Sequence, residues 1–295
     1  MIKEFLSSHG DYYDNKYFKD ITTLKMGGHI KHFVVPHSVD DLKVIISFLK
    51  TNRISFKVLG NGSNLVCGET EYDGVVISLK KFDSYEINND EVYVEAGVMA
   101  PVLANVLAKQ GLSCLEFASG IPGTIGGLVY MNAGAYKSSM ADVVNEVLVL
   151  KDDDLFWLNN DEMEFSYRHS VLHDHPRWVV VASKLKLEKK DPLEIEDLMA
   201  DRLRRRKETQ PLNLPSAGSC FRNPENEFAW KLIDGIGYRG YCQRDICVSE
   251  KHSNFIVNTG NGIADDYLDI AYQIQDKVNE KYKIKLVMEV EKFNC

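Results

Sequence analysis

The sequence predicts a protein of two domains that mix helices with strands. Its 295 residues suffice for two domains of ordinary size, and 44% of them are hydrophobic, as in a globular protein with a buried core. Short apolar runs of strand composition are interspersed with helical patterns up to about residue 190. There a strongly charged helical pattern begins, so we place the domain boundary at this point, with domains at 1–190 and 191–295.

In the first domain, residues Ser38 to Asp41 form a capping box that opens a helix through about Lys50. The apolar face of this helix is predicted to be Val44, Ile45, Phe48 and Leu49. Pro101 is suited to the first turn of a second helix, which Gly111 ends. Strands are predicted at 56–59, 75–79, 92–96 and 177–187, and a hairpin at 147–150 and 155–158 around Lys-Asp-Asp-Asp.

The second domain is predicted to begin with a charged helix from Asp191 and Pro192 to about Lys207. Further elements are a helix at 226–233, a strand at 254–258, a helix at 264–281 and a final strand at 285–293. In the final strand Val287, Glu289 and Glu291 share one face, because side chains alternate along a strand.

Composition excludes several classes of function. A net charge of −8 and a pI near 5.5 argue against a nucleic-acid partner. No apolar run approaches the roughly 18 residues of a membrane span, and the N-terminus lacks the pattern of a signal peptide, so we expect a cytoplasmic protein. The six cysteines and eight histidines form no Cys-x-x-Cys or His-Glu-x-x-His. We expect free thiols and no metal.

The most informative stretch runs from Glu116 to Tyr136 and contains five glycines: Gly120, Gly123, Gly126, Gly127 and Gly134. Clustered glycines indicate positive φ angles or a close approach of the backbone to a bulky group. The flanks are apolar, which argues against a flexible linker. A loop that wraps a cofactor is favoured over a tight structural connection.

A second glycine-rich segment, Gly60 to Leu65, follows a predicted strand. Neither segment fits a P-loop or the full Gly-x-Gly-x-x-Gly dinucleotide fingerprint. The segment is suited to form a nest of N–H groups for a pyrophosphate, with Ser63 and Asn64 as further donors; an ordinary turn is the alternative. Together the two segments suggest one long cofactor held at two places.

The basic run Arg202, Arg204, Arg205, Arg206 and Lys207 has two interpretations. It either binds an anionic substrate or forms a solvated helix face.

Eight segments in order resemble the UDP-N-acetylenolpyruvoylglucosamine reductase family, and the resemblance covers the chain from about Thr22 onward. They are Thr23–Gly28, Leu59–Leu65, Gly120–Gly127, Asn132–Tyr136, Tyr167–Ser170, Ala217–Pro224, Val248–Asn258 and Glu289–Val290.

The resemblance implies an α+β fold with an FAD-binding domain of the vanillyl-alcohol-oxidase/p-cresol-methylhydroxylase type. Its two α+β lobes would lie at about 20–80 and 81–190, followed by a C-terminal α+β substrate domain. NADPH would reduce non-covalently bound FAD, which in turn would reduce an enolpyruvyl ether on a UDP-sugar to give UDP-N-acetylmuramate for peptidoglycan. About fifty residues separate Arg168 from Ser219, which resembles the shorter type that lacks an extra substrate loop. Oligomeric state is not indicated.

The same resemblance implies three catalytic residues. Arg168 would stabilise the substrate carboxylate while negative charge develops, Ser219 would donate a proton to the carbanion, and a protonated Glu289 would help the enol to form. The structural alternatives are a salt bridge for Arg168, a small turn residue at position 219 and a solvated strand residue at position 289.

The implied binding residues fall into two sets. The cofactor set is Gly60, Asn61, Gly62, Ser63, Asn64, Leu65, Ser119, Gly120, Ile121, Pro122, Gly123, Gly126, Asn132 and Gly134, and the substrate set is Tyr136, Arg206, Asn223 and His252. His252 is equally well interpreted as a core histidine. The chain departs from the family at Arg244-Asp245-Ile246, where Gly-Gly-Ala is usual, and at Arg222, where lysine is more common.

Two other functions compete with the reductase. One is an FAD-dependent oxidase of the same fold, which would not need Ser219 together with Glu289. The other is a non-catalytic flavin or nucleotide-sugar binding protein, suggested by the altered loop at Arg244–Ile246.

Overall fold

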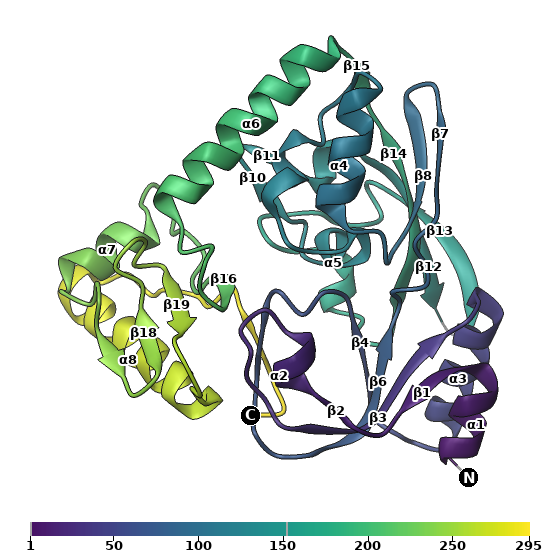
Figure 1. Ribbon diagram of the computed structural model, residues 1–295, viewed down its shortest axis with the longest axis horizontal. Coiled ribbons are helices and arrows are strands. Elements are labelled where there is room, and N and C mark those ends of the chain that lie inside the picture. Colours follow the sequence, from purple (N-terminus) through teal and green to yellow (C-terminus); the bar gives the residue numbers. More distant parts are fainter. Residues whose placement is uncertain (1, 152) are drawn as a thin grey trace. The chain divides into compact units, whose positions relative to one another are not determined.

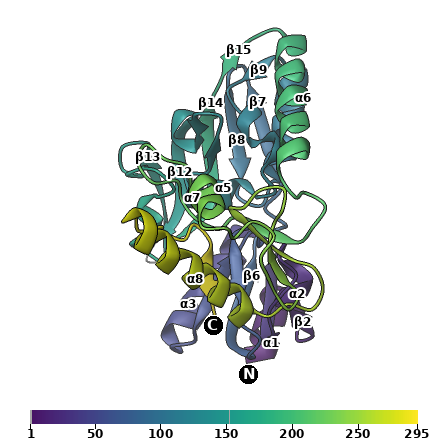
Figure 2. The same cartoon turned by 90° about the vertical axis from the view of Figure 1, so that its left-hand side faces the viewer.

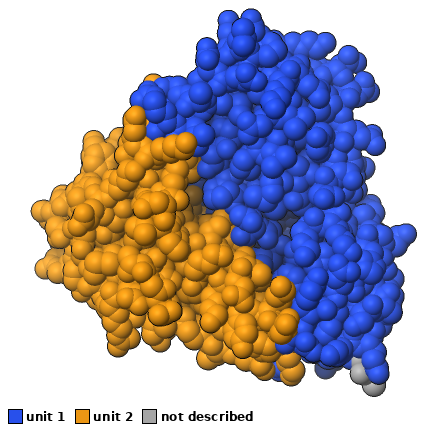
Figure 3. Space-filling model, viewed as in Figure 1, with its two compact units in different colours: residues 1–14, 32–61, 73–204 blue, residues 15–31, 62–72, 205–295 orange. Residues whose placement is uncertain are grey.

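The computed structural model describes residues 2–151 and 153–295 (Figure 1). These form two compact units, coloured separately in Figure 3: unit 1 comprises 1–14, 32–61 and 73–204, and unit 2 comprises 15–31, 62–72 and 205–295. The chain passes from unit 1 to unit 2 inside α6 (Pro192–Thr209). The boundary at residue 190 concerns functional domains and stays a prediction.

Unit 1 contains an antiparallel sheet in the order β13-β12-β14-β8-β7 (Figure 1). Its strands are β7 (Tyr85–Asn88), β8 (Glu91–Glu95), β12 (Val144–Lys151), β13 (Asp154–Asn159) and β14 (Val179–Lys186). The predicted hairpin is confirmed, since Lys151 lies opposite Asp154. Asp152, in the predicted turn, lies outside the described residues.

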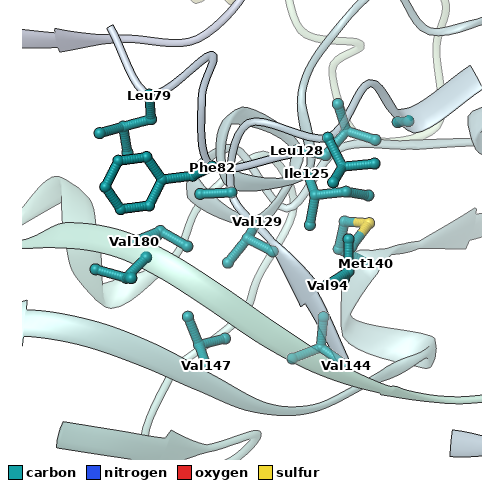
Figure 4. Packing of buried hydrophobic residues seen from close by; sticks show 14 of the residues in the cluster. Leu79, Phe82, Val94, Ile125, Leu128, Val129, Met140, Val144, Val147 and Val180 are labelled. Atoms are coloured by element: carbon teal, nitrogen blue, oxygen red, sulfur yellow. The ribbon is translucent and has the colours of Figure 1, made fainter. Parts of the chain in front are cut away.

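One face of this sheet is covered by α5 (Ile125–Tyr130), and α4 (Ala100–Lys109) belongs to the same core. Figure 4 shows Ile125 and Val129 of α5 pointing into the cluster that contains Val147 and Val180 of the sheet. The predicted start of α4 beside Pro101 is confirmed, as is its end before Gly111, whose φ is +69°. The core therefore fixes α5, and with it the glycine-rich loop that precedes this helix.

A second sheet has the order β1-β3-β6-β4, with β2 paired to β3. Its strands are β1 (Gly10–Tyr13), β2 (Lys16–Tyr17), β3 (His29–Pro36), β4 (Phe56–Leu59) and β6 (Tyr72–Ser78), accompanied by α1 (Ile2–His9) and α3 (Val39–Thr51). The predicted cap of α3 is confirmed, because the Ser38 hydroxyl accepts a hydrogen bond from the Asp41 N–H at 3.1 Å. The predicted apolar face of α3 was wrong at one residue, because Val44 is 41% exposed. The buried stripe consists of Leu42, Ile45, Ile46 and Leu49, which has the spacing of one helix face.

Unit 2 is built on the antiparallel sheet β16-β19-β18-β17, with α7 and α8 packed against each other in the same core (Figure 2). The elements are β16 (Ser216–Ser219), β17 (Cys242–Gln243), β18 (Ile246–Val248), β19 (Phe255–Asn258), α7 (Ala229–Gly235) and α8 (Ala264–Tyr282). Two strands far apart in sequence, β5 (Leu65–Cys67) and β20 (Glu291–Phe293), pair in parallel.

The remaining elements are short. They are α2 (Phe18–Ile21), β9 (Leu112–Ser113), η1 (Glu116–Gly120), β10 (Gly134–Ala135), β11 (Ser138–Ser139), η2 (Met140–Asp142), η3 (Val171–His173) and β15 (Glu188–Lys189). Within the part of the chain that is described, no helix is both long and apolar enough to cross a membrane.

The predicted final strand at 285–293 was largely wrong, because only β20 at 291–293 is a strand. Residues 287–289 instead make two backbone hydrogen bonds to the segment after β16, Arg222 N–H to Val287 O and Glu289 N–H to Cys220 O, at 2.9 and 2.8 Å. Pro224 follows shortly and has no N–H for a longer ladder. The predicted alternation does hold in this segment, since Leu286 and Val290 are buried and Val287 is exposed.

The expectation that all six cysteines are free was wrong. Cys242 and Cys247 form a disulfide, while Cys67, Cys114, Cys220 and Cys295 are in no disulfide. The cause is the hairpin of β17 and β18, which places Cys242 directly opposite Cys247. A spacing of five residues has no meaning as a motif until the hairpin is known.

Candidate active site

The two glycine-rich segments meet in unit 1. The Asn61 side-chain amide donates to the Pro122 carbonyl at 2.7 Å. A Cβ added to Gly60 would lie 2.7 Å from the Thr124 hydroxyl, so only glycine allows this approach. The structure thus brings together the two loops that the sequence assigned to one cofactor.

The loop before α5 is anchored by Glu116, a buried carboxyl group. Its two oxygens accept hydrogen bonds from the Ser113 hydroxyl at 2.5 Å and the Cys114 N–H at 3.0 Å. Thr124 caps α5 by accepting a hydrogen bond from the Gly127 N–H. A Cβ on Gly127 would meet only this Thr124 hydroxyl within 4 Å, at 3.6 Å. There is therefore room for a side chain at Gly127, which the close approach of a bulky group to the backbone would require.

The rest of the first glycine-rich segment belongs to unit 2. Gly62 has a φ of +61°, and a Cβ there would lie 2.7 Å from the Ile21 carbonyl, so glycine is required. The Asn64 side-chain amide donates to the carbonyl of Glu289 at 3.1 Å. Leu65 begins β5, where it pairs with Glu291. The predicted cofactor loop and the predicted catalytic Glu289 are therefore tied to each other.

Arg168 lies in a tight turn of unit 1 closed by Ser166 and His169. Its backbone is left-handed, with a φ of +57°, which costs energy for any residue but glycine. Its guanidinium donates to the Gly134 carbonyl at 2.7 Å and lies 5.1 Å from the centre of the Tyr167 ring.

Asn132 holds the same turn. Its side-chain amide donates to the Ser166 carbonyl at 2.8 Å, and its oxygen accepts from the Ala141 N–H at 2.9 Å. Asn132 was predicted to contact the cofactor, and in the structure it links the segment after α5 to the arginine turn. Tyr136 donates its hydroxyl to the Arg202 carbonyl at 3.0 Å and remains 40% exposed.

Ser219 and Glu289 lie on neighbouring extended segments of unit 2. Ser219 ends β16 opposite Phe255, after Gly218 with a φ of +79°. The next residue, Cys220, accepts a hydrogen bond at its carbonyl from the Glu289 N–H at 2.8 Å. The backbone of the predicted carboxylic acid is therefore bonded to the residue that follows the predicted proton donor.

Comparisons with known proteins cover nearly the whole chain. Residues 30–156 match the family "FAD binding domain", and residues 210–293 match "UDP-N-acetylenolpyruvoylglucosamine reductase, C-terminal domain". The reductase of Caldanaerobacter subterraneus subsp. tengcongensis is 42% identical over 290 residues, which is 98% of this chain and 95% of that protein. The reductase of Anoxybacillus flavithermus is 41% identical over 94% of this chain and 93% of its own length. The crystal structure of the Thermus caldophilus reductase has a TM-score of 0.82 at 34% identity, covering 96% of this chain and 98% of that one.

The chain belongs to the UDP-N-acetylenolpyruvoylglucosamine reductase family. The predicted family is confirmed by these matches, as are the α+β class, the FAD-binding domain and the assignment to the oxidoreductases. The roles of individual residues are not tested by them.

The departure of this reductase from the family at Arg244-Asp245-Ile246 has a structural explanation. Arg244 donates to both carboxylate oxygens of Asp266 in the first turn of α8, at 3.2 and 3.3 Å, and Gln243 donates to the same group at 3.1 Å. Asp245 accepts from the Asn261 N–H at 2.8 Å. These three side chains hold the hairpin to the start of α8.

The predicted substrate residues of unit 2 differ in their surroundings. Asn223 accepts from the Ala229 N–H at 3.0 Å and so caps α7. Arg206 lies in the last turn of α6. Burial, and next the positive charge of Arg239, lower the pKa of His252. The Nδ1 atom of His252 is buried and makes no hydrogen bond among the described residues.

Cys220 differs sharply from its neighbour Ser219. Its thiol is fully buried, and burial raises its pKa to about 12. Tyr267, also fully buried, lies against it and has a raised pKa for the same reason. The partly exposed Ser219 and the buried Cys220 therefore face opposite sides of the strand.

Sequence reasoning missed Asn254, Glu116 and Asp266. All three are buried polar residues whose bonds hold a loop or strand. Asn254 lies within the motif Val248–Asn258 and Glu116 at the start of the glycine-rich stretch, but the sequence indicates no bonding partner for any of the three.

Proposed function

We propose that this chain reduces the enolpyruvyl ether of UDP-N-acetylglucosamine enolpyruvate to the lactyl ether of UDP-N-acetylmuramate, with NADPH as the reductant. The observation that carries the proposal is that Ser219 and Glu289 lie on neighbouring extended segments of unit 2, which are joined by the hydrogen bond from the Glu289 N–H to the Cys220 carbonyl. A proton donor beside a carboxylic acid suits the reduction of an alkene conjugated to a carboxylate. An oxidase would need neither group.

The residues that would hold FAD are those of the two glycine-rich segments, with open space beside Gly127 and donors in Ser63 and the backbone. Bound FAD, once reduced by NADPH, supplies a hydride to the vinyl CH2 carbon of the substrate. No His or Cys lies inside either segment, so we expect the FAD to be held non-covalently.

Residues of the chain then stabilise the developing negative charge and supply the proton. Arg168 stabilises the substrate carboxylate, where negative charge accumulates as the hydride arrives. Ser219 gives its hydroxyl proton to the neighbouring carbon, so that the C=C bond becomes a single bond with one added hydride and one added proton, and solvent reprotonates the serine. Glu289, in its protonated form, donates a hydrogen bond to the carboxylate oxygen and favours the enol.

Tyr136, Arg206, Asn223 and His252 are proposed substrate contacts, and Arg206 is assigned to the diphosphate. We further propose that the chain works in the cytoplasm as part of peptidoglycan synthesis, and so in cell shape and division. The short spacing between Arg168 and Ser219 supports the type that lacks the extra substrate loop.

The test is the visible spectrum of the purified protein under nitrogen. NADPH should bleach the flavin bands, and the enolpyruvyl sugar nucleotide should then restore them in one equivalent, with UDP-N-acetylmuramate as the product. Reoxidation by oxygen alone, with no response to the enolpyruvyl compound, would identify an oxidase instead. Binding of the sugar nucleotide without restored absorbance would identify a non-catalytic binding protein.

A further inference from the structure

The segment that follows Ser219 is held by hydrogen bonds to one residue, Asn254. This residue lies directly before β19 and is 3% exposed. Its Oδ1 accepts from the Phe221 N–H at 3.0 Å, and its Nδ2 donates to the Phe221 carbonyl at 2.8 Å. Its own carbonyl accepts from the Cys220 N–H at 2.7 Å. Three hydrogen bonds therefore fix the two residues after Ser219.

The pairing of β16 with β19 explains why the hydrogen bonds of Asn254 are needed. Ser216 lies opposite Val257 and Ser219 opposite Phe255. An advance of three residues along β16 therefore corresponds to an advance of two residues along β19. The extra residue interrupts the ladder beside Gly218, whose φ is +79°. Beyond Ser219 the Asn254 amide replaces a strand partner by bonding both backbone groups of Phe221.

The opposite edge of the same segment faces Glu289. The Cys220 carbonyl accepts from the Glu289 N–H, and the Arg222 N–H donates to the Val287 carbonyl. The segment after Ser219 is thus held between Asn254 on one side and residues 287–289 on the other. Removing one side frees the segment to shift relative to Glu289.

We infer that Asn254 is a positioning residue for the Ser219 hydroxyl. Its side chain touches no reacting atom and acts only by fixing the backbone of Phe221, beside the backbone bond from the Cys220 N–H to the Asn254 carbonyl. This role rests on the proposed function of Ser219 as proton donor. A small displacement of a proton donor is expected to slow its step without affecting steps that do not use it.

A matched control is available at the other end of β19. Asn258 is 1% exposed, and its Oδ1 accepts from the N–H groups of Gly260 and Gly262 at 3.1 and 3.0 Å. Its Nδ2 donates to the Leu24 and Lys25 carbonyls. Asn258 is the same residue type and is similarly buried, and its side chain makes four hydrogen bonds against the two of Asn254, none of them to residues 219–221. A variant at Asn258 measures the cost of losing a buried amide in unit 2.

The experiment compares Asn254→Ala with Asn258→Ala in the FAD-loaded protein by stopped-flow absorbance of each half-reaction. Asn254→Ala should slow oxidation of the reduced flavin by the enolpyruvyl substrate about ten- to a hundredfold, while NADPH still reduces the flavin at near the wild-type rate. The solvent deuterium isotope effect on the slowed step should rise, because proton transfer then limits it. In Ser219→Ala, the further change Asn254→Ala should add nothing, since the group it positions is gone.

A second readout does not depend on activity. Hydrogen exchange followed by mass spectrometry should show faster exchange of the Phe221 amide, which loses its acceptor, in Asn254→Ala and not in Asn258→Ala. If Asn254→Ala does not fold, Asn254→Asp replaces it, because this variant keeps the volume and the acceptor, loses the donor to Phe221 and sets a carboxylate oxygen against the Phe221 carbonyl. Its effects should have the same direction.

The outcomes separate the two levels of the proposal. Should Ser219→Ala oxidise its flavin normally, the assignment of the acid fails, and the role of Asn254 with it. If Ser219→Ala is slow but Asn254→Ala and Asn258→Ala behave alike in both half-reactions, only the inference about Asn254 is overturned. Additive effects of Asn254→Ala and Ser219→Ala would overturn it as well.

Discussion

The turn that carries Arg168 in unit 1 and the strand that carries Ser219 in unit 2 hold their functional groups in different ways. The long arginine side chain is fixed near its tip, by the hydrogen bond from its guanidinium to the Gly134 carbonyl. The short serine side chain is fixed through its backbone, which is bonded on both edges just after Ser219. A side chain with many rotatable bonds has to be anchored near its charged end, whereas a hydroxyl one bond from Cβ has only the χ1 rotamers to choose from once its backbone is placed.

The largest expected effect separates Ser219 from Cys220 within the strand. Ser219→Ala should slow oxidation of the reduced flavin by the enolpyruvyl substrate by several orders of magnitude, because the carbanion has no acid beside it. Reduction by NADPH should stay near the wild-type rate, since it precedes any proton transfer to carbon. Stopped-flow absorbance measures both steps.

Cys220→Ala is the matched variant for this test. The Cys220 thiol is buried on the other side of the strand, and burial raises its pKa to about 12, so both half-reactions should remain nearly intact. If Cys220→Ala slows oxidation of the reduced flavin while Ser219→Ala keeps the wild-type rate, the acid has been assigned to the wrong residue.

The next largest effect tests the arginine turn. Arg168→Met should slow the same oxidation step on the order of 10²–10³-fold, the usual result of removing a group that stabilises developing charge. Arg53→Met is the control, because Arg53 is an exposed arginine with a similar backbone φ, +55° against +57°. Equal rates for the two variants would return Arg168 to a structural role.

Glu289→Gln should lower turnover by about a hundredfold, because an amide cannot supply the proton of a carboxylic acid. The backbone bonds of residue 289 to Cys220 and Asn64 do not involve its side chain. The variant should therefore retain its fold and its flavin spectrum. Steady-state turnover near the wild-type value would show that the carboxyl group is not needed.

Substitutions at two glycines compare the arginine turn and the serine strand by their cost in the free energy of unfolding. A Cβ on Gly134, beside the arginine anchor, would lie 2.3 Å from the Ser138 carbonyl, so Gly134→Ala should cost about 1–3 kcal/mol or more by overpacking. A Cβ on Gly218 would meet nothing within 4 Å, and only its φ of +79° is unfavourable, so Gly218→Ala should cost about 1–2 kcal/mol. Urea unfolding measures both, and a larger cost at Gly218 would contradict the steric argument.

The smallest expected effect is a pH dependence in unit 2. The pKa of His252 is lowered by burial and then by Arg239, so the folded state binds a proton less readily than the unfolded chain. Its contribution to stability is present above the ordinary histidine pKa of about 6.5 and is lost as the pH falls below that value. His252→Gln should flatten the fall in unfolding free energy between about pH 7.5 and 5. An unchanged slope would assign the fall to other groups.

Local signals predicted local structure well. The Ser38 cap, the Pro101 start of α4 and the hairpin around residue 152 each depend on a few neighbouring residues, and each element is present. The predictions were wrong where the structure of a segment depends on residues that are not its neighbours in the sequence. The extended segment at 285–290 finds a partner for only two backbone bonds, and the Cys242–Cys247 pair depends on the hairpin of β17 and β18.

The site shows the same division. Ordered motifs located Ser219, Glu289 and both glycine-rich segments, because these carry the resemblance to the family. Asn254 lies inside the motif Val248–Asn258 and Glu116 opens the glycine-rich stretch, but no role was predicted for either, because the role of a buried amide or carboxyl group is recognised only when its bonding partners are known. The backbone strain at Arg168, with a φ of +57°, is likewise invisible in the sequence.

The pairing of β5 with β20 has a consequence for the order of folding during synthesis. The Asn64 side chain bonds to Glu289, a residue 225 positions later in the chain, and Leu65–Cys67 pair with Glu291–Phe293. The segment that follows the first cofactor loop therefore stays without these partners until almost the whole described chain has left the ribosome. Closing so long a loop is slow compared with local pairing. We expect nascent chains stopped before residue 289 to leave this loop open to protease, and release of the last residues to protect it.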